Sequence, residues 1–415
     1  MENIKREIKG TKGCGKRCHA SRLMPPRVSG LTSRAPWPKV KLGEVLSIKH
    51  GYAFEGDGIS SEDNGVVLVT PGNFQLGGGF KESNKKFFTK AYPESYVLKA
   101  GDFIVTMTDL SKDTDTLGYS AKVPSSDKVY LHNQRIGLVD VFNKNADREF
   151  VYWFMRTRAY QRTIAGCASG VSVKHTSPQK IYSAEIPLPP LPVQRRIADI
   201  LFAYDDLIEN NRRRIAILEE TVRLTYRKWF GGVEEGRTAT LGEIADVVMG
   251  QSPESKTYND NGEGLPFHQG VTGFGFRYPR NEMWCTAGTR FAEEGDILFS
   301  VRAPVGRINV AGERIVIGRG LSAMRAKNGF QSWLLYALKH HFSKEDMIGV
   351  GCIFASTTKK ELLSVALPFP PDEEIAAFEQ IAGPIDAQIK ALSMQNAALA
   401  AARDMLLPRL MKNCL

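Results

Sequence analysis

The chain has no long hydrophobic run. Nowhere in its 415 residues does a stretch approach the roughly 18 consecutive apolar residues that a membrane-spanning helix needs. The first residues also lack the apolar core of a secretory signal peptide. Six cysteines are too few for a disulfide framework in a chain of this length. Together with the absence of an export signal, this predicts a reducing, cytoplasmic location.

Motifs of the common enzyme classes are missing as well. The sequence holds no HExxH motif, no GxSxG elbow, no complete phosphate loop and no Asn-Pro-Pro-Tyr run of the adenine methyltransferase type. The nearest approach to a phosphate loop places Arg17 where Ser or Thr would bind magnesium. Cys14, Cys18 and His19 resemble half of a zinc site, but no second ligand pair follows. We therefore predict no catalytic residue, no metal site and no cofactor site in this chain.

Positive charge is concentrated at the N-terminus. Residues 1–36 hold nine Lys or Arg against two Glu, which leaves the rest of the chain with a net charge of only +3 out of the total of +10. This segment has few large apolar residues and no periodicity, so it is predicted to be a disordered basic extension. Binding to nucleic acid would therefore depend on local patches in residues 37–415 and not on their bulk charge.

An internal repeat organises residues 37–415. The phrase Leu-Gly-Glu at 42–44 and again at 241–243 opens two segments. Ile-Pro-Leu-Pro-Pro at 186–190 and Leu-Pro-Phe-Pro-Pro at 367–371 close them, 181 residues apart. Each segment combines short β-type runs with one late helical stretch. The repeat predicts two similar α+β globular domains, at 37–190 and 233–371.

A helix with a heptad seam is predicted after each domain, at 191–232 and 372–415. The seam positions of the first helix are Ile197, Leu201, Tyr204, Ile208, Asn211, Ile215, Leu218, Val222, Thr225 and Trp229. Those of the second are Ile375, Phe378, Ala382, Ile385, Ile389, Leu392, Asn396, Leu399, Arg403, Leu406 and Leu410. Adding 181 to every position of the first seam gives a position of the second.

A heptad seam needs a partner helix, and the simplest partner is the other copy in the same chain. The expected fold is therefore two similar globular domains separated by two long antiparallel coiled-coil helices, with pseudo-two-fold symmetry. Asn211 and Asn396 would fix the register at some cost in stability. Gly383 and Pro384 predict a kink or a short break in the second helix. A helical rod of about 37–48 Å compares with about 34 Å for one turn of B-DNA.

Both domains carry clusters of basic, amide and aromatic side chains. Arg can bind guanine edges or phosphate, and Asn or Gln can bind adenine. The candidate DNA-binding residues are Tyr52, Lys112, His132, Asn133, Gln134, Arg135, Gln251, Ser252, Tyr258, Gln269, Arg302, Arg307 and Arg319. The alternatives are a turn that satisfies its own hydrogen bonds at 132–135, a core aromatic at Tyr52, and surface ion pairs for the arginines.

These residues resemble the specificity subunit of Type I restriction–modification systems, over nearly all of 37–415. The most specific pieces are PLPPLPVQRRI at 187–197, the Asp pair at 205–206 followed by NNRRR at 210–214, GQSP at 250–253 with Tyr258-Asn259, SVRAPVG at 300–306, IGRGL at 317–321 and LPRLM at 407–411. Two features depart from the pattern. They are the basic extension and a glutamate, Glu373 or Glu374, where a glutamine is common.

The resemblance implies a non-catalytic subunit with two target-recognition domains, each reading half of a split DNA sequence. The helices would set the gap and dock two modification (methyltransferase) subunits, and a restriction/translocase subunit would join them. S-adenosylmethionine, ATP and Mg²⁺ would then belong to those partners. A coiled-coil scaffold whose end domains bind proteins is the competing hypothesis. An enzyme that cleaves DNA itself is a third, which the missing motifs disfavour.

Overall fold

The computed structural model describes residues 36–83, 85–109, 111, 114–170, 173–231, 237–346 and 356–412. Only the last residue of the predicted basic extension falls within these ranges, so Cys14, Cys18 and His19 lie outside them. The contacts divide the chain into two units: residues up to 199 together with those from 406 onward, and residues 200–405. None of the described helices is long and apolar enough to cross a membrane.

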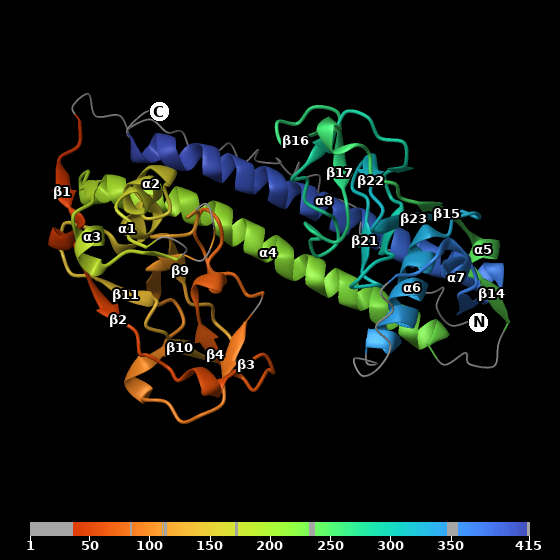
Figure 1. The fold of residues 1–415 in the computed structure, drawn as a ribbon, viewed down its shortest axis with the longest axis horizontal. Coiled ribbons are helices and arrows are strands. Elements are labelled where there is room, and N and C mark those ends of the chain that lie inside the picture. Colours follow the sequence, from red (N-terminus) through yellow and green to blue (C-terminus); the bar gives the residue numbers. More distant parts are fainter. Residues whose placement is uncertain are drawn as a thin grey trace, which may run out of the picture. The chain divides into compact units, whose positions relative to one another are not determined.

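Two sheets form the first domain (Figure 1). The five-stranded sheet has the order β3 (Ile59–Ser60), β5 (Lys86–Phe88), β4 (Val66–Val69), β10 (Val129–His132), β6 (Val97–Leu98). The four-stranded sheet has the order β2 (Leu46–His50), β11 (Ile136–Val141), β7 (Phe103–Thr106), β9 (Ser120–Lys122). The remaining elements are the pairs β1 (Lys39–Lys41) with β13 (Glu185–Pro187) and β8 (Thr108–Asp109) with β12 (Lys174–His175), and the helices α1 (Arg148–Phe154), α2 (Arg158–Gly166) and α3 (Pro178–Tyr182).

The second domain repeats this topology. Its five-stranded sheet has the order β16 (Tyr258–Asn259), β18 (Trp284–Cys285), β17 (Leu265–His268), β22 (Ile315–Ile317), β19 (Phe291–Ala292). Its four-stranded sheet has the order β15 (Ala245–Met249), β23 (Leu321–Ala326), β20 (Ile297–Ser300), β21 (Ile308–Val310). The remaining elements are the pair β14 (Thr238–Thr240) with β24 (Ala366–Pro368), and the helices α5 (Leu241–Ile244), α6 (Gln331–Asp346) and α7 (Lys359–Leu363).

Strand register confirms that the two domains are copies of one fold. The central pair is parallel in both, with Leu68 opposite Leu131 in the first domain and Phe267 opposite Val316 in the second. The numbering offset between copies is 199 at β2 and β15 but 185 at β11 and β23. The first copy is longer because its internal loops are longer, which is why the sequence repeat is clearest only at the segment ends.

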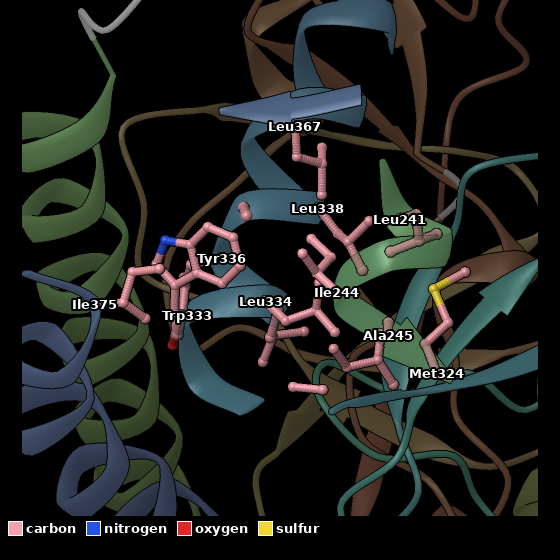
Figure 2. Close-up of a cluster of buried hydrophobic side chains, with 14 of the residues drawn as sticks. Leu241, Ile244, Ala245, Met324, Trp333, Leu334, Tyr336, Leu338, Leu367 and Ile375 are labelled. Atoms are coloured by element: carbon pink, nitrogen blue, oxygen red, sulfur yellow. The ribbon is translucent and has the colours of Figure 1, made fainter. Parts of the chain in front are cut away.

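Helix α6 supplies the centre of the core in the second domain. Figure 2 shows Trp333, Leu334, Tyr336 and Leu338 between the strands and the first turn of the C-terminal helix, where Ile375 lies. These side chains are almost completely buried. At about 25 cal/mol per Å² of apolar surface, burial of large side chains such as these is the main stabilising contribution to the domain.

The two long helices are α4 (Leu191–Phe230) and α8 (Asp372–Met411). Within residues 200–405 they pair in an antiparallel arrangement (Figure 1). Asn211 Nδ2 donates to Asn396 Oδ1 at 3.0 Å and to Gln395 Oε1 at 2.9 Å. Ile215 packs against Ile389 one turn further along. The predicted antiparallel coiled coil is confirmed, and the buried Asn211 amide finds partners on the facing helix.

Most of the seam residues expected to pack are buried. They are Ile197, Leu201, Ile208, Asn211, Ile215, Val222, Ile389 and Leu392. The others are partly exposed: Leu218, Ile385, Asn396, Leu399 and Leu406.

Two details of the helices differ from the prediction. Helix α8 continues without a break through Gly383 and Pro384. Ala382 and Ile385, on either side, both pack on the core of the second domain and hold this segment in place.

The end of the α4 seam is also different. Tyr226 and Phe230 are buried after Val222, whereas Trp229 is 38% exposed. Thr225 is half-buried and the Trp229 ring still lies 6.2 Å from Phe378 of α8, so both predicted seam positions border the helix pair, but its centre here is formed by Tyr226 and Phe230. The buried face of α4 shifts here because the rings of Tyr226 and Phe230 pack against Phe378 of α8, with centroids 5.8 and 5.6 Å from its ring.

Candidate nucleic-acid interface

In the second domain, three chain segments that follow strands meet at one place. Gln251 follows β15, Gln269 follows β17 and Arg319 follows β22. Gln251 N donates to Ile317 O at 3.0 Å, and Gly320 N donates to Gln269 O at 3.0 Å. Ser252 Oγ joins the segments, since it donates to Gln269 Oε1 at 2.8 Å and accepts from Arg319 N at 3.2 Å. The backbone therefore brings together four predicted residues that are distant in sequence.

Glycines on both sides of Arg319 permit this close approach. A Cβ at Gly318 would lie 2.6 Å from Gln269 Oε1, and one at Gly320 would lie 2.5 Å from Gln269 O. Both glycines are buried, whereas Arg319 between them is exposed. The Gly-Arg-Gly sequence thus holds the Arg319 backbone against the β17 end while leaving the guanidinium to solvent.

The other candidates of this domain border the same place. Tyr258 packs on Phe267 with ring centroids 4.6 Å apart, and its hydroxyl donates to Pro253 O at 2.8 Å. Burial raises the pKa of Tyr258, while the nearby positive charge of Arg319 acts in the opposite direction. Val301 N donates to Gly320 O at 2.9 Å, which places the exposed Arg302 next to the Gly-Arg-Gly turn.

Arg307 lies at the far end of the loop that Arg302 begins. Its N–H donates to Ser300 Oγ at 2.8 Å, so Ser300 closes the loop at the end of β20. Arg307 is exposed like Arg302. All seven candidates of the second domain thus lie on connected segments at one end of its sheets.

The first domain builds an equivalent backbone frame. Tyr52 N donates to His132 O at 2.8 Å, as Gln251 N does to Ile317 O. Met107 N donates to Arg135 O at 2.9 Å, as Val301 N does to Gly320 O. In both domains a turn follows the central strand and is closed by a backbone hydrogen bond. In the first domain Ile136 N donates to Asn133 O at 2.9 Å, and in the second Leu321 N donates to Gly318 O at 3.0 Å. Residues 132–135 and 317–320 are therefore structural counterparts.

Side chains within the 132–135 turn divide into two groups. His132 and Asn133 are 1% and 8% exposed. His132 Nε2 donates to Ile136 O at 2.9 Å, and Asn133 Oδ1 accepts from Arg135 N at 3.0 Å. The structure therefore places these two as parts of a turn that satisfies its own hydrogen bonds. Gln134 and Arg135 are exposed and available to a ligand.

Tyr52 is 43% exposed and belongs to an aromatic cluster rather than to the core. Its ring lies 5.1 Å from Phe54 and 5.3 Å from Tyr96, and its carbonyl accepts from Gln134 N at 2.9 Å. Lys112, the remaining candidate of this domain, lies outside the described residues.

Acid should destabilise the first domain through His132. Burial lowers the pKa of His132, although the bond to Ile136 opposes this shift. The unfolded chain then binds a proton that the folded chain does not, so stability falls as pH drops below about 6.5, by up to about 1.4 kcal/mol per pH unit. His132→Gln keeps an N–H donor but does not titrate. We expect its unfolding free energy, measured in urea at pH 7.5 and 5.5, to fall less than that of wild type. Equal losses would contradict this role.

Sequence reasoning missed Arg277. Its side chain is 4% exposed, and Nη1 donates to Glu219 Oε2 of α4 at 2.7 Å. Nη2 pairs with Asp386 of α8, and Nη1 also contacts the Tyr336 hydroxyl of α6 at 3.2 Å. Burial opposes the charge of Arg277, but Asp386 and Glu219 raise its pKa further above its ordinary value. Arg277 thus joins the second domain to both helices, and nothing in its local sequence distinguishes it from exposed arginines such as Arg319.

Polar contacts also connect each domain with the helix that follows it. Gln194 of α4 accepts from Asp147 N at 2.8 Å, just before α1. In the second domain Glu379 of α8 accepts from Ser332 N and Trp333 N at 3.1 and 3.0 Å, at the start of α6. The expected glutamate substitute was Glu373 or Glu374, but the residue with the equivalent contact is Glu379. An offset of 181 residues pairs Gln194 with Ile375, so the sequence repeat does not identify Glu379 as the counterpart of Gln194.

A metal site was not expected. Within the described ranges, no group of three or more His, Cys, Asp or Glu side chains could hold a metal ion.

Comparison with known proteins gives one consistent result. The family model described as the Type I restriction modification DNA specificity domain matches residues 35–220 and 234–393. A protein named as the MjaX specificity subunit of a type I restriction enzyme in Methanocaldococcus jannaschii is 30% identical over 313 residues, covering 70% of this chain and 73% of that protein. The EcoBI specificity subunit of Escherichia coli is 25% identical over 202 residues, 48% of this chain and 39% of that one.

A solved structure shares the fold. The S subunit of a Type I restriction–modification system from M. genitalium superposes with a TM-score of 0.55 at 18% identity, covering 92% of this chain and 97% of that one.

Proposed function

Because the chain belongs to the Type I restriction–modification DNA specificity family, we propose that it recognises a two-part DNA sequence, with each α+β domain reading one half. We take 37–190 and 233–371 as target-recognition domains, and 191–232 and 372–415 as the helical spacers. This chain recognises the DNA sequence, and other subunits of the complex catalyse the reactions.

One observation carries the proposal. The two domains hold the same backbone frame but expose different side chains on it. Gln134 of the first turn corresponds to Arg319 of the second, and Tyr52 corresponds to Gln251. Arg favours guanine edges and Gln favours adenine. Two readers of different bases need this combination of a constant frame and changed contacts.

The antiparallel helices are proposed to set the gap between the two half-sites. Their exposed faces would dock two methyltransferase subunits, and a restriction/translocase subunit would complete the complex. S-adenosylmethionine, ATP and Mg²⁺ would be bound by those partners, and the complex would act in the cytoplasm. A scaffold that binds proteins in place of DNA is disfavoured by the match to a DNA specificity family over both repeats.

Methylation sequencing of the host genome tests the proposal. We expect a two-part motif with a fixed gap of unspecified bases, and we expect its methylation to disappear when this gene is deleted. A complementing gene copy controls for effects on neighbouring genes. Methylation that is unchanged by the deletion would contradict the proposed function.

A further inference from the structure

A fourth segment lies beside the predicted interface of the first domain. Strand β12 pairs with β8, so that His175 lies opposite Thr108. Thr176 N donates to Met107 O at 2.9 Å, and Met107 N donates to Arg135 O. The backbone order is therefore Tyr52, the 133–136 turn, Met107–Thr108, and then His175–Thr176. The candidate DNA-binding residues include members of the first two of these segments but none of the last two.

The second domain has a counterpart at the same position. Arg302 pairs with Ser356 as Thr108 pairs with His175. Thr357 N donates to Val301 O at 2.8 Å, which repeats the bond from Thr176 to Met107. Arg302 and Arg319, both candidates for DNA contact, lie in the two segments next to Ser356. Position 356 therefore ends a row of exposed residues whose other members are Gln251, Arg319 and Arg302.

The His175 ring is held in a defined position. Thr108 is 3% exposed, and its Oγ1 hydrogen-bonds to His175 Nδ1 at 3.1 Å. Ser169 and His175 exchange backbone hydrogen bonds of 2.9 and 2.8 Å, which fix the backbone of β12. His175 itself is exposed. Since Nδ1 is occupied, Nε2 is the ring nitrogen left to donate to, or accept from, a ligand.

We propose that position 175 in the first domain and position 356 in the second are specificity-determining positions that contact base edges. This rests on the proposed function. A base contact is favoured over a phosphate contact because the side chain differs between the copies, His against Ser, while the surrounding backbone bonds are the same. Phosphate contacts position a protein on DNA without reading sequence, so they give two such domains no reason to differ.

Two variants test the positions separately. His175→Ala removes the ring from the first domain, and Ser356→His places the same ring in the second. Gln179→Ala, a change at an exposed residue of α3 that does not belong to this row, is the matched control. Each full-length chain is assembled with its methyltransferase subunits and offered a DNA library randomised in both half-sites.

His175→Ala should reduce the preference at one base position of the first half-site by about five- to a hundredfold, and leave the second half-site unchanged. Ser356→His should change only the second half-site, and Gln179→Ala neither. A uniform loss of binding over all sequences, or unchanged preferences in both variants, would overturn the inference. If His175→Ala fails to fold, the inference is tested by Ser356→His alone, and an unchanged second half-site in that variant would overturn it. A wild-type complex that selects no two-part motif would instead overturn the proposed function.

Discussion

Replacing Arg277 with methionine should lower the free energy of unfolding of the unit formed by residues 200–405 by about 3–5 kcal/mol. The guanidinium bridges Glu219 of α4 and Asp386 of α8 and is almost completely buried. Its loss leaves Asp386 with the Tyr336 hydroxyl, 3.1 Å away, as its remaining hydrogen-bond partner in this cluster. Glu219 keeps its pair with Lys339. The Asp386 side chain is 17% exposed and would then lack a cationic partner, and a largely desolvated carboxylate without a counter-charge is costly.

Urea unfolding of the full chain measures this effect, with Arg314→Met as the matched control. Arg314 lies in the same domain, but its pair with Glu293 is more than 45% exposed on both sides. Such pairs contribute about 0–1 kcal/mol. The double variant Arg277→Met/Asp386→Leu should recover part of the lost free energy of unfolding, because the unpaired charge of Asp386 is then removed as well. If Arg277→Met and Arg314→Met unfold alike, the network does not hold the domain to the helices.

The overall architecture could be predicted because it depends on periodicity. Heptad spacing placed both Asn211 and Asn396 in the seams of two antiparallel helices without any structural information, and in the structure these two residues hydrogen-bond to each other. Hydrophobic period is a property of the sequence itself. The end of α4 could not be predicted in this way, because Tyr226 and Phe230 are buried by Phe378, a residue 148 positions after Phe230.

The interface was predictable at the level of segments but less so for individual side chains. The residues at 132–135 are adjacent in sequence and all polar, yet the turn buries His132 and Asn133 and exposes Gln134 and Arg135. Which residues of a turn face solvent is decided by its hydrogen bonds, and residue type alone does not reveal them. Nothing in the sequence around His175 indicated that it lies at the interface, because its place beside Thr108 arises from pairing between strands 67 residues apart.

Lengthening both helices by one heptad should lengthen the DNA gap. Seven residues add about 10 Å of helix, which corresponds to about three base pairs at 3.4 Å each. Duplicating residues 208–214 in α4 and 393–399 in α8 preserves the seam, because Asn211 bonds Asn396 and both insertions therefore lie at the same level. The heptad repeat keeps each inserted turn in phase with its partner.

A single insertion provides the control for this change. When only α4 is lengthened, the seam beyond the insertion loses its partner positions in α8, and recognition should be lost rather than altered. This variant separates a change of spacing from a general tolerance of the helices to added residues.

Methylation sequencing of cells that carry the doubly lengthened chain is the most direct test that the helices set the spacing. We expect both half-sites to keep their sequences and the gap of unspecified bases to grow by about three base pairs. An active complex that still methylates the original motif with its original gap would contradict the account.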